Sequence, residues 1–146
     1  MSSTPRAARA HFSDQNYRDI LAFRDQLRRF LAWSETQSRA AGLTPSQHQL
    51  LLAVRGHPGP DPPTIADIAE HLQLRHHSAV GLVDRAESAG LIRRVHDTDD
   101  KRMVRLFLEP AGADALETLT ALHITELAVL AEASTAFRLP RPPGQP

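Results

Sequence analysis

Residues 64–108 contain several consecutive sequence signals for secondary structure, and few folds are compatible with all of them. Thr64 and Asp67 have the spacing of a helix start, in which each side chain bonds a backbone N–H of the other residue. The apolar residues that follow recur at helical spacing. After a short turn, a second helix is expected over residues 76–89, with Gly90 as the left-handed residue that ends it.

Two segments of alternating polarity, residues 91–96 and 103–108, follow the second helix and are typical of half-buried strands. The polar loop between them contains three aspartates, which suit a turn. Two short helices joined by a tight turn are the unit that places its second helix in the DNA major groove. With a hairpin directly after them, residues 44–109 are predicted to form a winged helix-turn-helix. The fold class is therefore mainly α with a small β-hairpin wing.

These motifs resemble those of the MarR family of transcriptional regulators over roughly residues 14–133. Residues 83–94 are similar to the family's "vdrLe..GlveR" segment, and residues 97–102 resemble its wing signature, Asp-x-x-Asp-x-Arg. Residues 108–112 stand where the family usually has "LTxxG", and residues 44–47 resemble the "Txx[QE]" start of its second helix. Several motifs in the right order are more specific than any one of them.

The resemblance implies a sequence-specific regulator of double-stranded DNA, a homodimeric repressor of an inverted-repeat operator. It also implies that a small aromatic effector can release the DNA. Phe30, Trp33 and His48 are candidates for lining the effector cleft, although simple packing within the dimer is the favoured interpretation of the two aromatic rings. The operator, the regulated genes and the effector are not predicted.

The dimerisation region is expected to consist of helices at residues 14–41 and 110–134. MarR proteins usually dimerise through their first and last two helices, and we expect this chain to lack most of the final one. We expect the usual dimer, with a different helical geometry as the alternative. Residues 1–13 are expected to be flexible, and the proline-rich residues 137–146 to be disordered.

Composition excludes several classes of protein. A chain of 146 residues is expected to hold one domain, here residues 14–136, and 41% hydrophobic residues suit a globular protein. No apolar run reaches membrane-spanning length, and the first residues lack the apolar core of a secretory signal, so a cytoplasmic location is expected. The absence of cysteine excludes disulfides and thiol-based sensing.

Arg102 and Lys101 at the tip of the wing are the first candidates for contact with DNA. A cation there can enter a narrow minor groove, where the negative potential is concentrated. Asp100 is expected to orient Arg102 or a neighbouring arginine. The alternative, a solvated Asp–Arg turn pair, loses weight because a helix-turn-helix lies just upstream.

The start of the second helix supplies the remaining candidates, because that end meets the base edges in this motif. Arginine, histidine and serine can all bond to bases or phosphates. Two further arginines, Arg85 and Arg94, are weaker candidates: Arg85 can pair with Asp84 or Glu87 instead, and alternation sends Arg93 and Arg94 to opposite faces. The candidates in the first turn are Arg75, His76, His77 and Ser78.

The charge of the chain supports DNA binding only weakly. The formal charge of the chain is zero, and residues 75–105 hold seven arginines and lysines against five aspartates and glutamates. A winged helix that binds another protein, without an operator of its own, is therefore the alternative function.

An enzyme is not expected, because exposed carboxylates at a hairpin tip, such as Asp99, lack the burial that tunes a catalytic pKa. The eight histidines are scattered and none shows HExxH spacing, so neither a metal site nor a cofactor is predicted.

Overall fold

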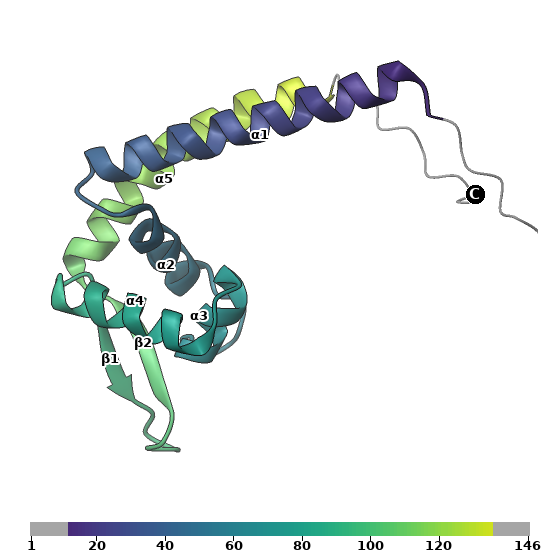
Figure 1. The fold of residues 1–146 in the computed structure, drawn as a ribbon. Coiled ribbons are helices and arrows are strands. Elements are labelled where there is room, and N and C mark those ends of the chain that lie inside the picture. Colours follow the sequence, from purple (N-terminus) through teal and green to yellow (C-terminus); the bar gives the residue numbers. More distant parts are fainter. Residues whose placement is uncertain (1–11, 136–146) are drawn as a thin grey trace, which may run out of the picture.

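The computed structural model describes residues 12–135, which form a long helical arm and a smaller lobe (Figure 1). In the arm, α1 and α5 lie side by side, and the lobe holds the three short helices and a protruding antiparallel hairpin. The predicted fold class is confirmed. The elements are α1 (Asp14–Ala40), α2 (Pro45–Gly56), α3 (Ile65–Leu72), α4 (His76–Ser88), β1 (Ile92–His96), β2 (Val104–Leu108) and α5 (Pro110–Thr135).

The helix starts follow from their capping residues. Thr64 and Asp67 form the expected reciprocal pair, and Thr44 does the same with Gln47. Ser13, which we expected to be in a flexible segment, caps α1 in this way. The rest of the predicted N-terminal segment, apart from Phe12, lies outside the described residues, as does the predicted tail at residues 137–146.

The turn between α3 and α4 contains a left-handed residue that was not predicted from the sequence. Gln73 has a left-handed backbone, with φ of 53°, and its N–H and that of Leu74 bond to carbonyls of the last turn of α3. Gly90, by contrast, has the expected left-handed conformation, with φ of 73°. These two reversals place α4 between α3 and the hairpin.

A single hydrophobic core joins the lobe to the base of α5. Gly112 lets α5 pass against the hairpin: a Cβ there would lie far inside contact distance of the carbonyl oxygen of Leu91. That carbonyl accepts a hydrogen bond from the N–H of Glu109 at 2.9 Å, so moving it away from α5 would disturb this bond. The core side chains that are 1% exposed or less include Leu50, Leu51, Ile68, Val83, Ile92, Leu106 and Leu119.

The hairpin register separates its two arginines, as alternation predicted. Arg94 pairs with Leu106 across the ladder, and Arg93 pairs with Phe107. Leu106 is buried, so Arg94 lies on the face that turns toward the lobe, and Arg93 lies on the opposite face.

Candidate nucleic-acid interface

The first turn of α4 is open to solvent. Arg75 is the N-cap and makes no side-chain capping bond, and the next three residues, His76, His77 and Ser78, are exposed. Beyond them, Ala79, Leu82, Val83 and Ala86 are buried and hold α4 on the core. The four predicted residues therefore form one polar surface at the positive end of the helix dipole.

Arg85 lies beside Gly81 on α4. A Cβ at Gly81 would lie 3.2 Å from Nη1 of Arg85, so the missing side chain leaves room for the guanidinium. In the described part of the chain, neither Asp84 nor Glu87 pairs with Arg85, because both pair with Arg94. Of the two roles considered for Arg85, the ion pair is therefore not formed among the described residues, and contact with DNA stays a prediction.

The wing tip presents Arg102 with 93% of its side chain exposed. Asp100 accepts hydrogen bonds from the backbone N–H of Arg102 at 3.1 Å and from its Nε at 3.2 Å. These two bonds hold the Arg102 side chain beside Asp100. Lys101 is exposed next to it.

Two residues that the sequence analysis did not single out hold the base of the wing. The Asp97 carboxylate accepts hydrogen bonds from the N–H groups of Asp99 at 2.8 Å and Asp100 at 3.3 Å, and from Nε of Arg105 at 3.1 Å. Arg105 also donates to the carbonyl of Pro62, at 3.1 Å. The aspartate at the start of the turn was a signal for this site, but its arginine partner was not.

Arg94 differs from the expectation that it faces DNA. Its guanidinium binds Asp84 and Glu87, the latter at 2.8 Å, and its N–H bonds to Glu87 at 3.0 Å. Burial, the largest single influence, lowers the pKa of Arg94, but the two carboxylates raise the pKa overall. Arg94 thus joins the wing to α4 with its charge already compensated.

Arg93 is also engaged, on the other face of the hairpin. It lies 5.1 Å from the ring centre of Phe107 and 3.5 Å from the Glu109 carboxylate. Neither arginine of the wing strand is therefore presented to DNA without a partner.

The predicted effector residues pack together instead of lining an open cleft. The rings of Phe30 and Trp33 lie 6.0 Å apart, and His123 lies 4.9 Å from Trp33 and 4.8 Å from His48. These separations are those of packed aromatic rings. Within one chain the two aromatic residues thus pack against each other and against His123, and their place in a dimer cleft stays a prediction.

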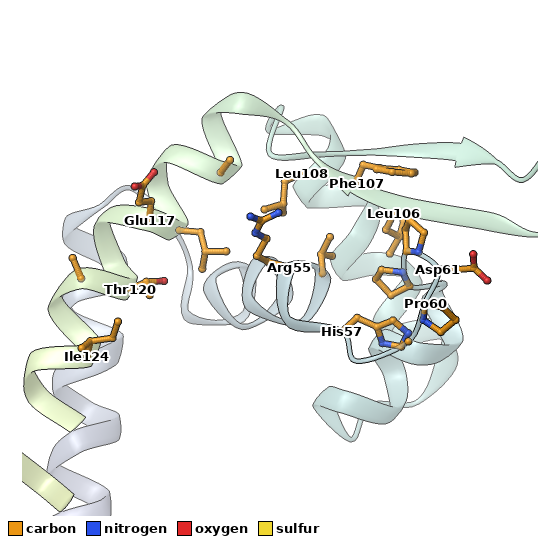
Figure 2. A pocket seen from close by; sticks show the side chains of 17 residues that line it. Arg55, His57, Pro60, Asp61, Leu106, Phe107, Leu108, Glu117, Thr120 and Ile124 are labelled. Carbon is orange, nitrogen blue, oxygen red and sulfur yellow. The ribbon is translucent and has the colours of Figure 1, made fainter. Parts of the chain in front are cut away.

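A cavity of about 980 Å³ lies elsewhere, between the lobe and the base of the arm (Figure 2). Its walls are the end of α2, the proline-rich residues 57–63, β2 and α5. Arg55 and Glu117 supply charged groups, and Phe107 and Leu108 supply apolar surface. None of Phe30, Trp33 and His48 is part of its lining.

Within residues 12–135, no three histidine, aspartate or glutamate side chains gather closely enough to hold a metal ion. His57 and His71 hydrogen-bond at 2.9 Å, with Asp67 4.0 Å from the other ring nitrogen of His57. None of the described helices has the length and apolar character to cross a membrane.

Comparison with known proteins shows which proteins this chain resembles. The sequence pattern of the MarR family matches residues 41–103. The crystal structure of a MarR family transcription regulator, 27% identical, superposes with a TM-score of 0.70 and covers 82% of this chain and 78% of that one. The chain is therefore similar to the MarR family over residues 41–103, and its fold is that of a MarR family transcription regulator.

Two further MarR-type proteins are similar to the chain. The HTH-type transcriptional repressor MdtR of Bacillus subtilis is 30% identical over 80 residues, which are 55% of this chain and 50% of MdtR. The chain thus matches about half the length of that curated relative. The DNA complex of MepR from S. aureus has the same fold, with a TM-score of 0.65, 22% identity and coverage of 76% of this chain and 78% of MepR.

Proposed function

We propose that this chain is a MarR-family regulator, a homodimeric, sequence-specific DNA-binding repressor of an inverted-repeat operator. One observation carries the proposal: two cationic surfaces, the first turn of α4 and the wing tip, project from the same lobe, and both are exposed. In this motif, the start of the second helix meets a major groove, and a cation at the wing tip can enter the neighbouring minor groove. Repression of transcription needs no catalytic group, so we propose no enzymatic activity.

The pairing of acidic residues supports DNA binding despite the neutral total charge. Four of the five carboxylates in residues 75–105 are engaged with arginines: Asp84 and Glu87 with Arg94, Asp97 with Arg105, and Asp100 with Arg102. In the described chain, Arg75, Arg85 and Lys101 have no such partner. The surface proposed to meet phosphates is thus more cationic than the count of charges suggests.

The named relatives point in the same direction. MdtR is described as a repressor, and MepR has been crystallised with DNA. For this chain, repression and the DNA partner are proposals based on that likeness and on the exposed cations. Binding to DNA would also place the protein in the cytoplasm.

Exposed apolar side chains on both helices of the arm support a homodimer. On α1, Tyr17 and Leu21 are 61% and 57% exposed, and on α5, Ile124 and Val129 are 64% and 59% exposed. Exposed large apolar side chains that gather on one part of a molecule are typical of an interface. A twofold axis through the arm would present two α4 helices to successive major grooves, roughly 34 Å apart.

The cavity beside β2 is the better candidate for an effector site than the packed aromatic cluster. We propose that it accepts a small aromatic molecule, with Phe107 as apolar surface and Arg55 as a cationic contact. Its walls continue into the strand that leads to the wing. An effector releases DNA only as far as it prefers the conformation that does not bind DNA.

The deciding experiment is selection of duplexes from a random pool with the full chain, followed by titration at two salt concentrations. An enriched inverted repeat whose affinity falls steeply with salt is the expected result. Absence of enrichment, even at low salt and with the dimer intact, would transfer the function to the alternative, a winged helix that binds another protein.

A further inference from the structure

Two histidines from distant parts of the sequence meet where the lobe joins the arm. His48 belongs to α2 in the lobe and His123 to α5 in the arm, and their ring centres are 4.8 Å apart. His48 is buried, with 6% of its surface exposed. Two serines of α1 contact the rings: Ser38 Oγ lies 3.0 Å from Nδ1 of His48, and Ser34 Oγ lies 2.6 Å from Nε2 of His123.

The hydrogen bonds fix where the protons of the neutral rings lie. Ser38 Oγ donates to the carbonyl of Ser34 at 2.9 Å, so it accepts from Nδ1 of His48. Nδ1 of His123 faces the carbonyl of Leu119 at 2.7 Å, and because a carbonyl only accepts, this nitrogen carries its proton. Nε2 of His123 is then an acceptor, and Ser34 donates to it. Every contact is satisfied with both rings neutral.

An added proton has no place in this arrangement. At Nε2 of His123 it would oppose the hydroxyl proton of Ser34, which would have to turn away. At Nε2 of His48 it would put a charge in a buried position, next to the other imidazole. Burial first, and then the charge of His123, hold the pKa of His48 below its usual value.

No carboxylate compensates such a charge within the described part of the chain. On α1, Glu35 pairs with Arg39 at 3.5 Å on the exposed surface, and the neighbouring groups on the inner face are the two serines and the rings of Phe30 and Trp33. Glu126, three residues beyond His123 on α5, forms no ion pair with either imidazole. On α2, the nearest charged side chain along the helix is Arg55.

We propose that the His48–His123 pair is a proton-sensitive joint, through which acidification loosens the lobe from the helical arm. The effect on DNA rests on the function proposed above; the effect on the joint does not. Unfolded histidine takes up its proton near pH 6.5. Below that pH, His48 binds more protons in the unfolded chain than in the folded one. The stabilisation that comes from neutral, buried His48 is therefore fully present above about pH 6.5 and is lost as the pH falls below it.

The single tryptophan of the chain provides a direct readout. Trp33 lies 4.9 Å from the ring of His123, so a charge on the pair should change its fluorescence. We would titrate the full chain from about pH 8 to about pH 5 and measure thermal unfolding over the same range. His48→Asn and His123→Asn keep a donor in the place of Nδ1 and cannot titrate. His96→Asn, at an exposed histidine of β1 whose Nδ1 lies 2.9 Å from the carbonyl of Lys101, is the matched control.

The wild type and His96→Asn should show a fluorescence transition below about pH 6.5 and a fall in Tm across it. In His48→Asn and His123→Asn, the fluorescence transition should be weaker, and the fall in Tm should be smaller than in the wild type by roughly 3–5 °C. If one variant fails to fold, the other still decides the outcome. Identical pH profiles in the wild type and a folded variant of the pair would overturn the proposal.

DNA binding is tested separately, with the selected duplex. His48→Asn should match the wild type at about pH 7.5 and bind about fivefold more tightly than the wild type at about pH 5.5. Equal affinities at the lower pH would remove the link to DNA and leave the joint standing. Failure of all proteins to bind any duplex would count against the proposed function alone.

Discussion

The Asp97 carboxylate and the Nε of Arg105 lie 3.1 Å apart, and this contact connects the turn of the wing to the proline-rich segment before α3. Asp97 orders the turn through two backbone N–H groups, while Arg105 reaches the Pro62 carbonyl. The wing therefore has a fixed base and an exposed tip. It also shares its base with the wall of the cavity, to which Pro62 contributes.

The acid response of the wing should depend on Asp97. Its pKa is held below the usual value, first by the N–H of Asp99 and then by Arg105. Because the folded pKa is lowered, its stabilisation is present above about pH 4 and is lost as the pH falls further. Asp97→Asn should reduce the loss of stability between about pH 5 and about pH 2, measured by thermal unfolding. The same profile in wild type and variant would contradict this role.

Arg102→Ala should weaken DNA binding without affecting the fold. The side chain is almost fully exposed, and its loss should cost about tenfold in affinity, within the range of roughly 1–3 kcal/mol for a specific contact. Fluorescence anisotropy with the selected duplex measures the change, and circular dichroism confirms the fold. Arg28→Ala on α1 is the control for a lost exposed arginine. Unchanged affinity in Arg102→Ala would remove the wing from DNA recognition.

Removing the carboxylates that hold Arg94 should strengthen DNA binding. In the double variant Asp84→Asn with Glu87→Gln, the recognition helix loses two negative charges and Arg94 loses its compensation. The affinity should rise, and the dependence of log K on log salt should steepen by about one to two units. Arg94→Ala should have the opposite effect, because both carboxylates are then uncovered. Equal salt slopes in all three proteins would place α4 away from the phosphates.

Gly112→Ala should destabilise the protein by about 1–3 kcal/mol, because the added methyl group meets the carbonyl of Leu91 and forces α5 to shift. Gly56→Ala is a suitable control, since a Cβ there meets nothing within 4 Å. Urea unfolding of the two variants gives the comparison. A Gly112→Ala protein as stable as the control would mean that α5 can move away from the hairpin without loss.

Leu127→Asp should split the proposed dimer. This residue of α5 is 44% exposed in the single chain, and a carboxylate there would be buried without a partner in an interface. Analytical ultracentrifugation should show monomers that retain their helical content, and DNA affinity should fall because two half-sites no longer bind together. A stable dimer in this variant would move the interface away from this part of α5.

Local signals in the sequence predicted most of the fold. The capping pair of Thr44 and Gln47, the glycine that ends α4 and the alternation of the hairpin are each contained in a few neighbouring residues. Gln73 was missed because its left-handed backbone is imposed by the packing of α3 against α4, not by its own preference.

The partners of the side chains required the tertiary structure. Alternation separated Arg93 from Arg94 correctly, but only the reversal at Gly90 brings Asp84 and Glu87 beneath Arg94. His48 and His123 are far apart in the sequence, and their contact depends on how α5 returns along α1. The exposed candidates, by contrast, lie in one turn or one hairpin, which is why the sequence could group them.

The clasp between Arg94 and α4 bears on any attempt to change the specificity of this scaffold by grafting. A donor helix without acidic residues at the positions of Asp84 and Glu87 would leave Arg94 without an ion-pair partner, and the hairpin would lose this one contact with the helix while Arg105 still holds its base. Transplants of α4 should therefore carry along the matching residue of β1. The segment to transplant is therefore α4 together with β1.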